Sequence, residues 1–173
     1  MKITLTGFGG TGTSTVGKLL AKKLACQFLS GGDMQRMVAK EKNMSLYEFD
    51  EYLKDHPDQD RLVEDQQITF GKEHNSFVME SLLSWYCVPD AFNVMLVCDF
   101  DTRIQRIASR EGISFTEAKE KNVARVNTYQ DRYGKLYGIE NIMDEEHFDL
   151  VVDTTKLTPN EVVEKILSVA TTV

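Results

Sequence analysis

A glycine-rich tract near the start of the sequence has the residue types and spacing that can hold a phosphate group. It reads Gly-Phe-Gly-Gly-Thr-Gly-Thr-Ser-Thr over residues 7–15, after a short apolar run and before apolar residues at helical spacing from Val16 to Leu24. Glycines let the backbone approach an anion and adopt positive φ, while backbone N–H groups and a helix N-terminus add partial positive charge. A strand, a glycine-rich loop and a helix in this order predict a phosphate-binding site.

One position of the tract departs from the usual phosphate-loop pattern, because Thr13 stands where that pattern has lysine. Ser14 follows the last glycine of the loop by two residues, where a hydroxyl holds Mg²⁺ in such loops. The alternatives are a flexible glycine turn without a ligand and a plain helix cap at Ser14. We expect the donor phosphates to contact Gly7, Gly9, Gly10, Thr11, Gly12, Thr13, Ser14 and Thr15.

The elements that must position this loop follow from strand-like runs that alternate with helical patterns. Strands are expected at 2–6, 27–30, 76–80, 93–98 and 149–153. Strands alternating with helices predict a parallel sheet covered on both faces, and ligands bind at the carboxyl ends of such strands. The loops after the first three strands should therefore face one site.

Helix starts are marked by capping residues. Asp33 is expected to cap a helix after the second strand. The segments 45–48 and 114–117 have the capping-box form, and Thr158-Pro159 is typical of the start of a final helix.

Charged side chains fall on the same edge of the predicted sheet. Glu80 ends the third strand, where an acid can hold magnesium through water, and Arg36 lies on the first turn of the helix after the second strand. Four further arginines lie on two later helices, at helical spacing or about two turns apart: Arg106, Arg110, Arg125 and Arg132. The arginines can bind phosphate, the alternative being that they lie on solvated helix faces. For Glu80 the alternative is a polar strand end without a metal.

Composition narrows the class of protein. The chain has 173 residues, 42% of them hydrophobic, which predicts one domain with a substantial core. Its formal charge of −7 argues against broad nucleic-acid or anionic-membrane binding. The three scattered cysteines predict thiols in a reducing compartment, the three histidines show no metal-ligand spacing, and no apolar run is long enough to span a bilayer. We therefore expect a cytoplasmic protein.

Taken in order, these segments resemble nucleoside monophosphate kinases of the phosphate-loop class, in particular archaeal-type (type 2) cytidylate kinases. The segment Ser-x-Gly-Asp-Met-x-Arg at 30–36 is similar to the one that binds the acceptor phosphate in that family. The stretch 106–114 resembles the start of their lid, Arg132-Tyr133 with 137–139 its end, and 149–154 their last strand. The similarity runs nearly from end to end.

The resemblance implies a three-layer phosphate-loop kinase fold with a five-stranded parallel sheet, a helical acceptor-binding lobe and a helical lid. Residues 1–173 would form one domain, with a core of 1–32, 74–108 and 138–173, a lobe at about 33–73 and a lid at about 109–137. The implied reaction transfers the γ-phosphoryl group of ATP to CMP or dCMP, giving CDP or dCDP, with Mg²⁺ as cofactor. A monomer that acts on small nucleotides, without nucleic-acid or membrane partners, is expected.

The resemblance also implies roles for individual residues. Ser14 and Glu80 would hold Mg²⁺, the latter through water, and the catalytic cations would be Arg106, Arg110, Arg125 and Arg132. Acceptor binding would fall to Ser30, Gly32, Asp33 and Arg36.

Two departures from the family pattern bear on these roles. Thr13 removes a point charge from the loop, and we expect the lid arginines to replace it. The family has Glu-Gly-Arg after the third strand, whereas this chain has Glu80-Ser81-Leu82, without the arginine that grips the acceptor phosphate and one residue shorter in this tract. Two alternatives follow: a kinase of the same fold with a different small acceptor, and a nucleotide-binding regulatory protein that has lost catalysis.

Overall fold

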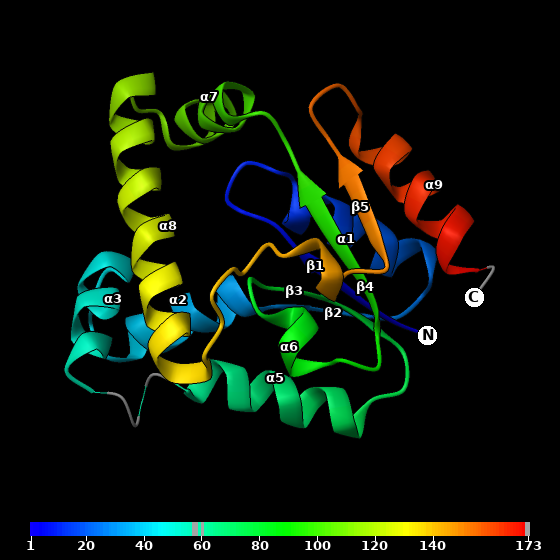
Figure 1. The fold of residues 1–173 in the computed structure, drawn as a ribbon, viewed down its shortest axis with the longest axis horizontal. Helices are drawn as coiled ribbons and strands as arrows, with labels where there is room; N and C mark the ends of the chain where they lie inside the picture. The colour runs from blue at the N-terminus through cyan, green and yellow to red at the C-terminus, as the bar shows by residue number, and fades with distance from the viewer. Residues whose placement is uncertain (57–58, 60, 172–173) are drawn as a thin grey trace.

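A five-stranded parallel sheet lies at the centre of the molecule in the computed structural model, which describes residues 1–56, 59 and 61–171 (Figure 1). The strand order is β2-β3-β1-β4-β5, with every neighbouring pair parallel. The strands are β1 (Lys2–Thr6), β2 (Gln27–Ser30), β3 (Phe77–Glu80), β4 (Phe92–Val97) and β5 (Leu150–Asp153). The predicted α/β class and the five predicted strands are confirmed, each bound lying within one residue of its expected place.

Helices connect the strands and cover both faces of the sheet (Figure 1). They are α1 (Thr13–Lys23), α2 (Gly31–Glu41), α3 (Leu46–Lys54), α5 (Leu62–Glu73), α6 (Ser84–Cys87), α7 (Phe100–Glu111), α8 (Phe115–Tyr137) and α9 (Pro159–Ala170), with a 3₁₀ turn at Glu145–His147. The four-residue α6 was not predicted, because it is too short to show a helical period.

Helix N-termini follow the predicted capping chemistry at most places. Ser45 and Glu48 form a reciprocal capping box at α3, and Thr158 forms another with Glu161 at α9. At α8 only half of the expected box is present: Ser114 Oγ accepts the backbone N–H of Glu117 at 3.1 Å, whereas the Glu117 carboxylate instead binds Lys121.

The prediction that Asp33 caps α2 is wrong. The helix begins at Gly31, and the cap is Ser30, three residues before Asp33. Its hydroxyl accepts a hydrogen bond from the backbone N–H of Asp33 at 3.1 Å. The Asp33 carboxylate instead forms an ion pair with Arg36 at 2.5 Å. Because the chain passes directly from β2 into the helix, the hydroxyl at the end of the strand lies close to the first free backbone N–H groups of the helix and caps them.

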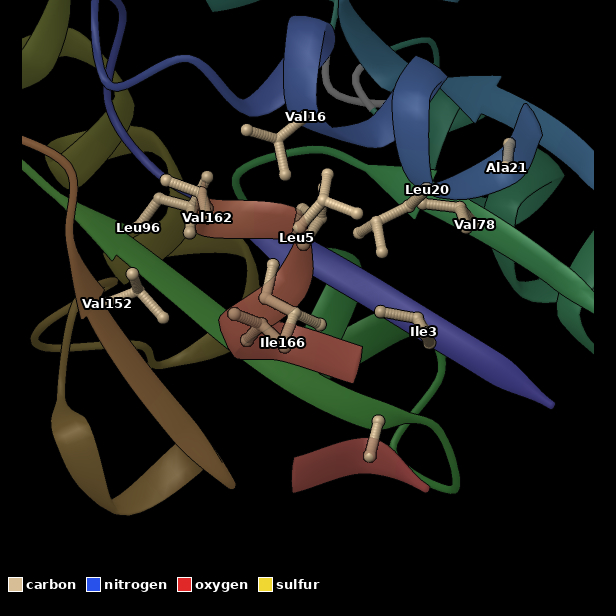
Figure 2. Packing of buried hydrophobic residues seen from close by; sticks show 13 residues of the cluster. Ile3, Leu5, Val16, Leu20, Ala21, Val78, Leu96, Val152, Val162 and Ile166 are labelled. Carbon is tan, nitrogen blue, oxygen red and sulfur yellow. The ribbon is translucent and has the colours of Figure 1, made fainter. Parts of the chain in front are cut away.

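The main hydrophobic core lies between the sheet and the helices α1 and α9. Figure 2 shows Ile3 and Leu5 of β1 between Val16 and Leu20 of α1 and Ile166 of α9. On the opposite face, Phe77 and Met79 of β3 belong to a second cluster with residues of α6, α8 and the segment that follows α8. The three layers are therefore α1 and α9, the sheet, and the helices on its other face.

Strand register brings the carboxyl ends of three strands together. Glu80, the last residue of β3, pairs with Leu5 of β1 on one side and with Ser30 of β2 on the other. The loop after β1, the start of α2 and the segment after β3 therefore share one edge of the sheet, as predicted.

Cys26, Cys87 and Cys98 carry free thiols in the structure. Across 1–56, 59 and 61–171, no helix combines the length and apolar character needed to cross a membrane.

Candidate active site

A cavity of about 370 Å³ opens at the carboxyl edge of the sheet. Its walls come from the loop after β1, the first turns of α2, the helix α5, the segment after β3, and the helices α7 and α8. The predicted site residues that line it are Gly7, Gly9, Gly10, Gly12, Thr13, Ser14, Thr15, Gly32, Arg36, Glu80, Arg106, Arg110, Arg125 and Arg132. Three other predicted residues, Thr11, Ser30 and Asp33, lie behind or beside this lining and support it through hydrogen bonds.

The phosphate loop takes its shape from glycines with positive φ. Gly10 has φ of 91°, and Gly12, which precedes α1, has φ of 96°. A Cβ atom placed on Gly10 would lie 2.5 Å from the carbonyl oxygen of Arg103, so no larger residue fits there without a backbone shift. Thr11 closes the turn through a 2.8 Å hydrogen bond from its hydroxyl to the Phe8 carbonyl. The first backbone N–H groups of α1 follow Gly12, which suits an anion.

Arg103 of α7 binds the outer side of this loop, a role that the sequence reading missed. Its Nη1 donates to the Gly9 carbonyl at 2.9 Å, and its guanidinium lies 5.5 Å from the ring centroid of Phe8 and 5.6 Å from that of Phe100. Only 7% of the residue is exposed, and burial lowers the pKa of the Arg103 guanidinium. The available signal was its spacing of three residues from Arg106, which places both on one face of α7.

Arg106 also binds backbone at the loop. Its Nη1 donates to the Gly10 carbonyl at 3.2 Å, and its Nη2 donates to the Thr154 carbonyl at 3.0 Å. The Thr154 hydroxyl in turn donates to the Thr11 carbonyl at 2.9 Å. Arg106 therefore joins the loop to the segment after β5, and its catalytic role remains a prediction.

Ser14 and Glu80 meet beside the loop. Ser14 Oγ donates to Glu80 Oε1 at 2.9 Å, and Ser30 Oγ donates to the same oxygen at 2.5 Å. Mg²⁺ is usually held by one or two protein oxygens together with phosphate and water. A hydroxyl and a carboxylate at the N-terminus of α1 fit that chemistry, and the described residues contain no cluster of three or more His, Cys, Asp and Glu side chains that could bind a metal by themselves.

Around α2, where acceptor binding is predicted, the cavity combines one exposed cation with neutral polar groups. Arg36 forms an ion pair with Asp33 at 2.5 Å, and both side chains are more than half exposed. Farther in, the Ser81 hydroxyl donates to Oε1 of the buried Gln67 at 2.5 Å. Leu82 lines the cavity at the tract where the family's arginine was expected.

One face of α8 forms the remaining wall. Its lining residues recur every three or four positions: Asn122, Arg125, Val126, Tyr129, Arg132 and Tyr133. Arg125 Nε donates to the Tyr129 hydroxyl at 2.7 Å, and Arg132 Nη2 lies 3.9 Å from Oε2 of the buried Glu64. Arg110 on α7 is exposed and pairs with Glu111 at 2.8 Å. The predicted arginines thus reach one cavity from two helices.

Sequence reasoning missed Glu64 and Asn122 as well as Arg103. Glu64 is 3% exposed and accepts a 3.4 Å hydrogen bond from the Tyr133 hydroxyl, which links α5 to α8. The period of three to four residues along α8, extended back from Arg125, would have reached Asn122. Glu64 offered no local signal, because its partners lie about seventy residues away in the chain.

Solved structures with the same architecture are kinases and related proteins. An uncharacterized protein from Eubacterium ventriosum matches with a TM-score of 0.73 at 18% identity, covering 100% of this chain and 99% of that one. Shikimate kinase from Aquifex aeolicus matches with a TM-score of 0.60 at 20% identity, covering 97% and 95%. These likenesses establish the three-layer α/β kinase fold.

Sequence relatives are more specific. Cytidylate kinase from Archaeoglobus fulgidus is 35% identical over 168 residues, covering 96% of this chain and 93% of that protein. Cytidylate kinase from Pyrococcus horikoshii is 38% identical over 160 residues, covering 92% and 83%. The model of the cytidylate kinase-like family matches residues 2–156, a range that contains every site residue described above. That match includes the phosphate loop, the Ser14–Glu80 pair and the arginine-lined cavity. On the family match and the identity with these relatives, the chain belongs to the cytidylate kinase-like family.

Proposed function

We propose that the protein is a nucleoside monophosphate kinase that transfers the γ-phosphoryl group of ATP to CMP or dCMP. The observation that carries this proposal is one cavity lined by a phosphate loop, by the Ser14–Glu80 pair and by Arg36. Such a cavity can hold two phosphorylated ligands facing each other. The names of the sequence relatives support cytidylate as the acceptor.

Catalysis in this proposal is mainly a matter of positioning and charge. The loop amides bind the donor phosphates, and Arg36, with Ser30, Gly32 and Asp33 forming the turn around it, binds the acceptor phosphate. Bound Mg²⁺, held by Ser14 and by Glu80 through water, would neutralise phosphate charge. Holding the two reactants in line lowers the barrier without covalent chemistry from the protein.

The arginines of α7 and α8 supply the cation that Thr13 does not. Arg110 is exposed at the cavity, and Arg125 and Arg132 face it from α8. Charge that develops on the transferred group is stabilised by such cations, most effectively where water is excluded. Arg106 adds its charge at the same place while it holds the Gly10 carbonyl.

The second candidate is a kinase of the same fold with a different small acceptor, which Leu82 raises but which the names of the sequence relatives do not favour. A cytidylate kinase with leucine in place of the expected arginine has one charged hydrogen bond fewer to its acceptor phosphate, a loss of roughly 1.5–3 kcal/mol. The Ser81–Gln67 pair beside it offers neutral hydrogen bonds instead. An assay over several acceptors therefore has to establish the acceptor preference.

A coupled ADP-release assay with Mg-ATP and a panel of CMP, dCMP, UMP, AMP and non-nucleotide small acceptors tests both candidates. The proposal expects the highest kcat/KM with CMP or dCMP, and Ser14→Ala should lower kcat strongly because it removes a metal ligand. Ser168→Ala, an exposed serine on α9, is the matched control and should leave the rate unchanged. Preference for another acceptor would favour the second candidate, and ATP binding without any transfer would indicate a regulatory protein.

Cytoplasmic location and a monomeric state also belong to the proposal. They are supported by the free thiols of the three cysteines and by the cavity, whose described walls come from one chain. The assay's dependence on added Mg²⁺, with EDTA as the reference, checks the cofactor.

A further inference from the structure

Asn122 lies on α8 where the lid helix faces the phosphate loop. It begins the row of cavity-lining residues that continues with Arg125 and Tyr129. A Cβ atom placed on Gly9 would lie 3.6 Å from Asn122 Nδ2, so the side-chain amide is directed at the exposed middle of the loop. Nothing in the proposed function assigns this residue a role.

Burial makes the position of this amide unusual. Asn122 is 9% exposed, and its Oδ1 is buried with no hydrogen-bond partner among the residues that the structure describes. Buried polar atoms in folded proteins nearly always have a partner, and an exception calls for an explanation other than stability. Leucine, of similar size, would fill the same space without this cost. Selection for stability therefore does not account for asparagine here.

We propose that Asn122 donates a hydrogen bond from Nδ2 to the terminal phosphate of the bound donor, as a further catalytic residue of the lid. This inference rests on the proposed phosphoryl transfer from ATP. In that proposal the transferred group lies in the cavity beside the loop, and Asn122 lines the same cavity next to Gly9 of the loop.

The chemistry of an amide fits this place between the loop and the arginines. Phosphate oxygens only accept hydrogen bonds at neutral pH, so the N–H₂ group is the part of the side chain they can use. A neutral donor adds a directed contact without another positive charge beside Arg125 and Arg106. Because ADP lacks the terminal phosphate, this contact distinguishes the donor from the product.

The test measures Mg-ATP and Mg-ADP binding by calorimetry without an acceptor, together with thermal unfolding. For Asn122→Leu we expect ATP binding to weaken roughly tenfold or more, ADP binding to stay within about twofold, and the unfolding temperature to be equal or higher. Asn122→Asp keeps the shape and should weaken ATP binding further, because a carboxylate repels phosphate. Asn127→Leu, at an exposed position of the same helix, is the control and should change neither ligand.

The outcomes separate this inference from the proposed function. Equal losses of ATP and ADP binding in both Asn122 variants, or ATP binding that is unchanged in both, would overturn the role of Asn122 and leave the kinase proposal intact. A lower unfolding temperature in Asn122→Leu together with unchanged ATP selectivity would make the residue structural. Wild-type protein that binds neither nucleotide would overturn the kinase proposal itself, and this inference with it.

Discussion

The arginines at the cavity differ in how strongly protein contacts fix their side chains. Arg103 and Arg106 bind carbonyls of the loop, and Arg103 is 7% exposed. Arg36 is more than half exposed, with Asp33 beside it. A guanidinium bound to backbone shapes the site before any ligand arrives, whereas an exposed one can exchange its partner for a phosphate at small cost.

The substitution Arg36→Ala tests the acceptor end at this scale. We expect KM for the acceptor to rise roughly tenfold or more, because a charged hydrogen bond is removed, while KM for ATP changes little. Steady-state kinetics with each substrate varied in turn measures the difference. Lys40→Ala, an exposed cation on the same helix, is the control. Equal effects on both substrates would assign Arg36 a structural role.

Among the secondary-structure elements, α7 supports the phosphate loop through side-chain and backbone contacts. It provides the guanidinium on the Gly9 carbonyl and the backbone carbonyl that Gly10 approaches. Of the two loop glycines with positive φ, Gly10 lies against α7, whereas Gly12 has open space around it. The loop and the helix thus form one unit, although about ninety residues separate them.

Arg103→Met should therefore loosen the loop while it keeps most of the packing on Phe8 and Phe100. We expect Mg-ATP binding to weaken by roughly 1.5–3 kcal/mol and thermal stability to fall, since a charge-assisted hydrogen bond to the Gly9 carbonyl is lost. Calorimetry and thermal unfolding provide the measurements. Gln105→Met, exposed on the same helix, should leave both unchanged. Normal ATP affinity in Arg103→Met would show that the loop keeps its conformation without the hydrogen bond from Arg103 to Gly9.

Elements were more predictable from the sequence than the contacts between them. Apolar runs such as 2–6 and 93–98 identified strands because a covered parallel sheet needs them, and their order placed Glu80 beside the loop. The prediction at Asp33 was wrong because Ser30, three residues earlier in the chain, is an equally good cap. Helical spacing from Arg106 and Arg125 indicates the faces on which Arg103 and Asn122 lie, but their contacts are with the loop, far away in the chain. Glu64 has no such local signal. The division into core, lobe and lid remains a prediction.

At the scale of the whole molecule, α8 connects the region around α7 with the acceptor side. Figure 1 shows this helix running from α7 toward α2 and α3, and the Arg61 guanidinium donates to the Leu136 carbonyl at 3.2 Å near its end. Asp50 of α3 accepts a 2.6 Å hydrogen bond from Gln35. Burial raises the pKa of Asp50 even though the charges of Arg125 and Arg132 on α8 lower it.

This raised pKa predicts a pH-dependent effect of Asp50→Asn. Because the folded state disfavours the charged carboxylate, Asp50 contributes stability below its ordinary pKa of 3.8 and loses that contribution as pH rises through the folded value. The variant should therefore have a higher free energy of unfolding than wild type at pH 7, with the gain absent below pH 3.8. Urea unfolding at both pH values measures it, with the exposed Asp55→Asn as control. A less stable variant at pH 7 would mean that the two arginines outweigh burial.

The central place of β1 in the sheet has a consequence for synthesis on the ribosome. β1 pairs with β3, which ends at Glu80, and with β4, which ends at Val97, so a nascent chain carries its central strand with both edges open until these partners emerge. Arg103 and Thr154, which hold the loop, emerge later still. Nucleotide therefore has no completed loop to bind during most of translation, and it can stabilise this protein only near the end of chain growth or after release.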